Sequence, residues 1–264
     1  MPLYLRRVPR LIFVLFACNV ALIAAPVLDM AAGRPFSRLS RFLYLDAETT
    51  LQAWYSSMLW FVAAVFFGLV ATHAHFSRLR GALAVALFAA ACLAFSIDEI
   101  AGVHEWLGQK SDALLPGGDR TNTALARTGI WPLLIGIPVV VLLAAICLRA
   151  RSIFEPRAPR AFQLLTIGLV LMFTGALAVE MLLNLLERPA TYSAIHLLQH
   201  ASEEFLEMLG ASVVVWSGLK LLKAYGFELK VPEPAHSTRK HDSETRETRG
   251  HPLNWSAEKP EDTH

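Results

Sequence analysis

Six apolar runs divide the chain into alternating hydrophobic and polar segments. They cover about residues 11–31, 52–72, 82–103, 130–148, 162–186 and 201–222. Each run is long enough to cross a hydrocarbon core of about 30 Å, because an α-helix rises about 1.5 Å per residue. The pattern predicts an all-α fold, a polytopic membrane helix bundle with six transmembrane helices, over residues 1–230. Residues 231–264 lack an apolar period and are predicted to form a disordered cytoplasmic tail.

The composition agrees with a membrane protein and argues against a soluble domain. Of the 264 residues, 55% are hydrophobic and 17% are charged. The net charge is only +2 and the arginines are spread over short loops, so we expect membrane lipids and no nucleic acid as partners. The oligomeric state stays open. Cys18, Cys92 and Cys147 lie inside apolar runs without a CxxC spacing and are predicted to be buried small hydrophobes.

Arginine and lysine near the ends of the runs predict the orientation in the membrane. Eleven share a side with the N-terminus: Arg6, Arg7, Arg10, Arg78, Arg80, Arg149, Arg151, Arg157, Arg160, Lys220 and Lys223. Seven lie on the other side: Arg34, Arg38, Arg41, Lys110, Arg120, Arg127 and Arg188. Because cytoplasmic loops carry the excess of positive residues, we predict an N-in/C-in protein of the bacterial inner membrane. The segment from Arg34 to Arg41 is predicted to be a short interfacial helix that meets lipid phosphates.

The start of the sixth run carries the most unusual polar pattern. At about 100° per residue, one helical stripe holds His196, His200, Glu203 and Glu207. A charged group that faces lipid costs about 2.5–3.5 kcal/mol near the bilayer centre. The stripe is therefore predicted to face the protein interior.

Polar residues of three other predicted helices converge at the same outward face of the membrane. These are Glu48, Gln52 and Tyr55 on the second, Asp98, Gly102 and Glu105 on the third, and Glu180, Asn184 and Glu187 on the fifth. Stripes at similar depth pair with one another in a bundle interior, so we predict an outward-facing pocket rich in histidine and carboxylate. Gly102 and Gly175 are expected to allow close helix approach, whereas Glu99 and Glu204 lie off the stripes and are expected to reach the water interface.

Carboxylates outnumber the basic residues in this cluster, so either some are protonated or a cation lies among them. The candidate metal ligands are His196, His200, Glu203 and Glu207, with His104 as a further candidate off the main stripe. The candidate catalytic residues are Asp98, Glu105 and Glu180. The HxxxH pair can offer two ring nitrogens to one ion, and facing carboxylates can complete a zinc site or bridge two irons. The expected cofactor is a divalent metal, with zinc and iron both open.

Two motifs in this region resemble a known family. The pattern SxDExxxxHE, from Ser96 to Glu105, together with EExxEMxG, from Glu203 to Gly210, is similar to uncharacterised bacterial multi-pass membrane proteins. That resemblance implies the fold and no activity. A weaker similarity is to membrane hydrolases that include alkaline ceramidases and adiponectin-type receptors, which hold zinc with histidines including an HxxxH pair. There His196 and His200 match the pair and Ser96 and Asp98 match loosely, but six helices are predicted instead of seven.

The leading hypothesis is a metal-dependent enzyme that acts on a lipid or other amphiphile, either a hydrolase or a di-metal oxidase. In the hydrolase, zinc would acidify a bound water and Asp98 would take its proton. The alternatives are a proton- or ion-coupled transporter and a structural membrane subunit whose polar cluster fixes helix register. The polar residues gather at one face and the sequence contains no internal repeat, which argues against a transporter.

Overall fold

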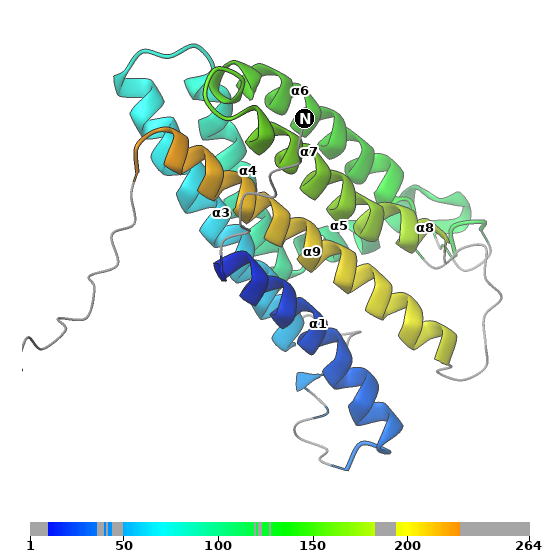
Figure 1. Ribbon diagram of the computed structural model, residues 1–264. Coiled ribbons are helices and arrows are strands. Elements are labelled where there is room, and N and C mark those ends of the chain that lie inside the picture. The colour runs from blue at the N-terminus through cyan, green and yellow to red at the C-terminus, as the bar shows by residue number, and fades with distance from the viewer. Residues whose placement is uncertain are drawn as a thin grey trace, which may run out of the picture. The chain divides into compact units, whose positions relative to one another are not determined.

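Six long helices make up most of the protein in the computed structural model (Figure 1). The structure describes residues 10–35, 40, 42–43, 50–118, 120, 123–126, 128–182 and 194–227. All six helices are long and apolar enough to cross a membrane, and the described residues contain no strand. The predicted six-span all-α fold is therefore confirmed. The orientation of the termini stays a prediction, and the predicted tail and most of the interfacial helix lie outside the described residues.

The bounds of the helices follow from the apolar runs and from local signals at their ends. The elements are α1 (Arg10–Ala31), α3 (Leu51–Phe76), α4 (Ala82–Ala101), α6 (Ile137–Phe154), α7 (Pro159–Phe173) and α9 (Ala194–Ala224). Thr50 caps α3, since its side chain accepts a hydrogen bond from the Ala53 amide at 3.3 Å. Pro159 begins α7, at a position where its missing N–H is not needed.

Two of the spans contain π-helical turns. The short helix η3 (Pro132–Gly136) leads into α6, and η4 (Thr174–Val179) joins α7 to α8 (Glu180–Leu182). In η3 the Ile137 amide donates to the Pro132 carbonyl, and Pro138 in the next turn has no amide to donate. In η4 the Thr174 hydroxyl donates to the Val170 carbonyl at 2.7 Å, a contact that often accompanies helix bending. π-helical turns are rare and occur frequently at functional sites.

Five helices form a closed ring of neighbours, in which α3 contacts α4, α4 contacts α6, α6 contacts α7, α7 contacts α9, and α9 contacts α3. Helix α1 lies outside this ring against α9 and α3. The two helices α7 and α9 meet backbone to backbone: a Cβ added to Gly210 would lie 2.6 Å from the Gly168 carbonyl oxygen. The glycine of the EExxEMxG motif is thus where these two helices cross.

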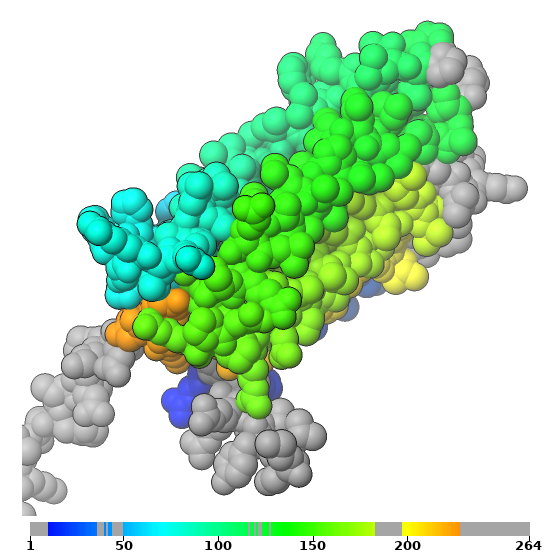
Figure 2. All heavy atoms as spheres, turned by 90° about the horizontal axis from the view of Figure 1, so that it is seen from above, coloured from blue at the N-terminus to red at the C-terminus, as the bar shows by residue number. Residues whose placement is uncertain are grey.

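The two ends of the ring differ. The turn between α3 and α4, cyan in Figures 1 and 2, lies at the same end as the C-terminus of α9, in orange. Toward that end the ring is filled by buried Phe67, Phe88 and Phe154, with the Phe67 and Phe88 ring centroids 4.8 Å apart. The opposite end carries α5 (Val103–Ser111), η1 (Asp112–Leu114), η2 (Pro116–Gly118) and the polar residues described below.

Candidate functional site

A helix break at Gly102 brings His104 into two contacts with Asp98. Gly102 adopts φ 56° and ψ 37°, a left-handed conformation that ends α4, and α5 begins at the next residue. The break turns His104 back onto the last turn of α4. The His104 amide donates to Asp98 Oδ1 at 2.9 Å, and the ring Nδ1 lies 2.7 Å from Asp98 Oδ2. In an unbroken helix these two residues, six positions apart, would point to different faces.

The environment of His104 favours its charged form. Burial alone would lower the pKa of His104, but the hydrogen bond and the negative charge of Asp98 raise that pKa to about 9. Asp98 binds Nδ1, so Nε2 is the ring nitrogen that a ligand can meet. The His104 side chain keeps 40% of its surface exposed, and its ring lies 5.3 Å, centroid to centroid, from the ring of Trp131.

The two π-helical turns build the wall opposite Asp98. Trp131, at the start of η3, donates from Nε1 to Glu180 Oε1 at 3.1 Å. The turns themselves are in contact, because a Cβ added to Gly136 would lie 2.5 Å from Leu177 Cδ2. The absence of a side chain at Gly136 therefore lets η3 and η4 pack together, which holds Trp131 against Glu180.

Helix α9 supplies a third polar wall. Gly175 in η4 lets α9 approach closely: a Cβ added there would lie 2.8 Å from the Glu203 carbonyl oxygen and 3.0 Å from Glu207 Cγ. The predicted role of Gly175 in helix approach is confirmed, whereas Gly102 serves a different purpose and ends a helix. Nearby, Ser56 of α3 donates to Glu99 Oε1 at 2.9 Å.

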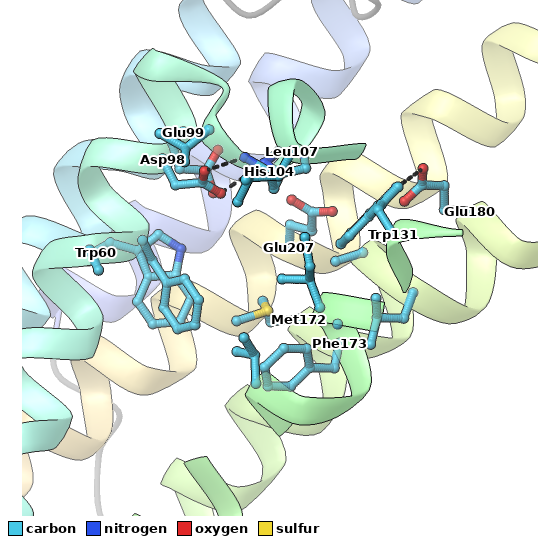
Figure 3. Close-up of a pocket in the computed structure, with 18 of the residues that line it drawn as sticks. Trp60, Asp98, Glu99, His104, Leu107, Trp131, Met172, Phe173, Glu180 and Glu207 are labelled. Atoms are coloured by element: carbon cyan, nitrogen blue, oxygen red, sulfur yellow. Dashed lines mark hydrogen bonds and ion pairs between the residues drawn. The ribbon is translucent and has the colours of Figure 1, made fainter. Parts of the chain in front are cut away.

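These walls enclose a cavity of about 450 Å³ inside the ring of helices (Figure 3). Its polar end holds Asp98, Glu99, His104, Glu180, Glu203 and Glu207. Its apolar part includes Trp60, Phe95, Val139, Met172, Phe173 and Leu177. Two further lining residues, Ile97 and Val103, are 57% and 42% exposed, so the cavity reaches the surface of the bundle beside the end of α4.

The structure brings together only part of the predicted polar cluster. Asp98, Glu180, Glu203, Glu207 and His104 line the cavity. Glu105 is exposed on α5 and is absent from the lining, because the break at Gly102 removes it from the Asp98 stripe. His200 lies beside Glu203, with Nδ1 3.7 Å from Glu203 Oε2, and does not line the cavity. The side chain of His196 lies outside the described residues, as do Glu48, Asn184 and Glu187.

The prediction that Gln52 and Tyr55 of α3 belong to the cluster is wrong. Gln52 Nε2 donates to the Leu22 carbonyl at 2.9 Å, and the Tyr55 hydroxyl donates to the Leu15 carbonyl at 3.1 Å. Both side chains therefore bind the backbone of α1 instead of the cavity. The contribution of α3 comes from Trp60, which lines the cavity, and from Ser56.

Other residues of the site were not identified from the sequence. Glu99 was expected at the water interface, yet it lines the cavity and accepts the Ser56 hydrogen bond. Nothing in the sequence singles out Trp60, Trp131 or Phe173, because an apolar run does not distinguish a cavity wall from a core contact. The pairing of His104 with Asp98 was also missed, and the signal that could have revealed it is the glycine two residues before His104, since a glycine near the end of an apolar run often ends a helix.

The described residues contain no group of three or more His, Cys, Asp or Glu side chains placed to hold a metal ion. The side chain of His196, one of the predicted ligands, is not among them. The metal therefore stays a prediction. Of the three cysteines, all free, Cys92 and Cys147 are buried as predicted and Cys18 is partly exposed.

No curated protein and no solved structure matches the chain. One family model does match, and it covers four of the six spans in full and most of the first and last, including every residue that lines the cavity. This agrees with the expected membership in an uncharacterised family and lends no support to the weaker similarity to membrane hydrolases. The chain belongs to the family described as Domain of unknown function (DUF8692), which is matched over residues 11–221.

Proposed function

We propose that this integral membrane protein binds an amphiphile in the cavity and that His104, oriented by Asp98, exchanges a proton with the polar end of that ligand. The observation that carries the proposal is the Asp98–His104 pair at the polar end of a largely apolar cavity. A volume of about 450 Å³ falls in the range of small-molecule sites, which are mostly apolar with a few convergent polar groups.

The position of the cavity suggests that the ligand comes from the bilayer. The exposed lining residues Ile97 and Val103 lie at the end of the span α4 and the start of α5. A molecule with an apolar chain can remain in the hydrocarbon phase while its polar end reaches the carboxyl groups and His104. The buried phenylalanines fill the ring toward the other end, an arrangement that favours a binding site over a transport path.

The chemistry of the site is acid–base chemistry. A carboxylate that binds Nδ1 of a histidine fixes the ring and stabilises its charged form, which leaves Nε2 to give or take a proton. With its pKa raised to about 9, His104 carries the proton at neutral pH and is suited to act as an acid. The proposed step is a proton transfer and includes no covalent intermediate.

A metal-dependent reaction is the second candidate, and the contact between His200 and Glu203 favours it. Either residue can bind zinc or iron, and Glu203 lines the cavity. Metal analysis of the purified protein and of His200→Ala tests this candidate. Stoichiometric zinc or iron that is lost in the variant supports it, and a wild-type protein without bound metal contradicts it.

The binding proposal can be tested in nanodiscs of phosphatidylcholine with three probes of equal chain length: dodecyltrimethylammonium, dodecanol and dodecyl phosphate. Ala94 lines the cavity, so Ala94→Phe fills part of it, whereas the neighbouring Leu93 is exposed on the same helix and does not line it. We expect at least one probe to bind saturably, with affinity lowered at least tenfold by Ala94→Phe and unchanged by Leu93→Phe. Saturable binding that Ala94→Phe leaves unchanged, or no saturable binding, would contradict the proposal.

The role of His104 can be tested with the pH profile of dodecyltrimethylammonium binding, because this probe does not titrate. The groups whose charges act on His104 are Asp98, Glu105 and Glu180. We expect the affinity to change with an inflection near pH 9, to lose that inflection in His104→Gln, and to shift it to lower pH in Asp98→Asn. A profile that His104→Gln leaves unchanged would contradict the role of His104.

A further inference from the structure

The polar end of the cavity has a pronounced charge imbalance. Five carboxyl groups line it, from Asp98, Glu99, Glu180, Glu203 and Glu207, and the described lining contains no Lys or Arg. The single basic lining residue, His104, is already paired with Asp98 at 2.7 Å. Glu203 lies beside His200, and the described lining offers no Lys or Arg to Glu99, Glu180 or Glu207.

The partners of these carboxyl groups single out Glu207. Trp131 donates to Glu180, Ser56 donates to Glu99, and His200 lies beside Glu203. Among the described residues none donates a hydrogen bond to Glu207, which is half-buried and lines the cavity. Its carboxyl group lies between the Asp98–His104 pair and the Trp131–Glu180 pair in Figure 3. A ligand in the cavity would meet this group centrally.

Aromatic rings form the wall next to this acidic end. Trp60 packs on Phe95 with ring centroids 5.1 Å apart, and Phe95 packs on Phe173 with centroids 6.5 Å apart. All three residues line the cavity. Aromatic faces attract cations, quaternary ammonium groups in particular, and they also pack against alkyl chains.

We propose that the ligand of the cavity is a cationic amphiphile, with an amine head at Glu207 and an apolar chain along Trp60, Phe95 and Phe173; a quaternary ammonium serves as the probe of this charge that does not titrate. The inference rests on the proposed function, because it names the class of ligand for the same cavity. An anionic head such as a phosphate or carboxylate would be repelled by Glu207 and by the other carboxyl groups of the lining, which outnumber His104. A cationic head supplies the counter-charge that the lining lacks.

The test compares the affinities of the three dodecyl probes for the full chain in phosphatidylcholine nanodiscs. Only binding whose affinity is lowered by Ala94→Phe is taken as binding in the cavity. This criterion separates cavity binding from partitioning into the lipid. We expect dodecyltrimethylammonium to bind at least tenfold more tightly than dodecanol, and dodecyl phosphate to show no such binding. Glu207→Gln should lower the affinity for the cation about tenfold and leave the affinity for dodecanol within about twofold.

Glu155→Gln is the matched control, since it removes the same charge from an exposed residue at the end of α6 that does not line the cavity, and it should change none of the affinities more than twofold. If Glu207→Gln does not fold, Glu203→Gln at the same wall replaces it, with an expected loss of about threefold or more. Cavity binding of dodecanol or dodecyl phosphate that equals or exceeds that of the cation would overturn this inference and leave amphiphile binding standing. Absence of cavity binding by every probe would overturn the proposed function itself.

Discussion

The left-handed conformation of Gly102 is predicted to control the Asp98–His104 pair, and Gly102→Ala tests this directly. At φ 56° an alanine side chain approaches its own backbone too closely, which costs roughly 1–2 kcal/mol for a single residue. If the segment instead relaxes toward a continuous helix, the His104 amide and ring both leave Asp98. We therefore expect Gly102→Ala to lower the free energy of unfolding by about 1–2 kcal/mol and to return the pKa of His104 toward its ordinary value.

Gly68→Ala provides the control, because the same substitution should have the opposite effect there. Gly68 lies within α3, and a Cβ added to it would meet no heavy atom within 4 Å. Alanine is favoured over glycine in a helix interior by about 1 kcal/mol, so this variant should be as stable as wild type or more stable. Unfolding in mixed micelles with increasing dodecyl sulfate measures both variants, and NMR titration of the His104 ring measures its pKa.

A Gly102→Ala protein as stable as Gly68→Ala, with the pKa of His104 still near 9, would refute this reasoning. It would mean that the helix break does not depend on glycine or that Asp98 is not what raises the pKa. A stability loss without a change in pKa would preserve the role of Gly102 in the fold and contradict its role in the site.

Two further predictions concern stability. The folded-state pKa of His104 is raised from 6.5 to about 9. The His104–Asp98 pair therefore stabilises the fold fully below pH 6.5, and this contribution is lost as the pH rises through 9. Thermal unfolding measured from pH 6 to 10 should show the loss of stability, and Asp98→Asn should make the stability depend less on pH. Gly210→Ala should destabilise the protein by about 1–3 kcal/mol, because the alanine Cβ would lie 2.6 Å from the Gly168 carbonyl oxygen. Unfolding in dodecyl sulfate measures this loss, and an unchanged stability would mean that α7 and α9 are not in backbone contact.

The spans were predictable from the sequence because the thickness of the bilayer sets both the length and the apolarity of a membrane helix. The run at 11–31 became Arg10–Ala31, and the run at 52–72 became Leu51–Phe76. The third run was placed at 82–103 and the helix ends at Ala101. Differences of a few residues at the ends reflect caps and turns, which depend on local geometry more than on hydropathy.

The site was less predictable because stripe arguments assume an unbroken helix of 3.6 residues per turn. That assumption places Asp98 with Glu105, whereas the break at Gly102 pairs Asp98 with His104. The π-helical turn η4 shifts the register before Glu180 in the same way. A polar stripe also does not say which neighbour it faces, so Gln52 and Tyr55 were assigned to the cluster although both bind the backbone of α1.

The central claim is that the cavity between α4, η3, η4 and α9 holds an amphiphile. Photo-crosslinking with an alkyl ammonium probe that carries a diazirine at the middle of its chain tests it most directly, with labelled peptides mapped by mass spectrometry. The account predicts labelling of cavity residues such as Phe95 and Phe173 that excess dodecyltrimethylammonium suppresses and Ala94→Phe abolishes. Labelling confined to exposed residues outside the cavity, such as Phe13 and Leu83, and insensitive to the competitor would contradict it.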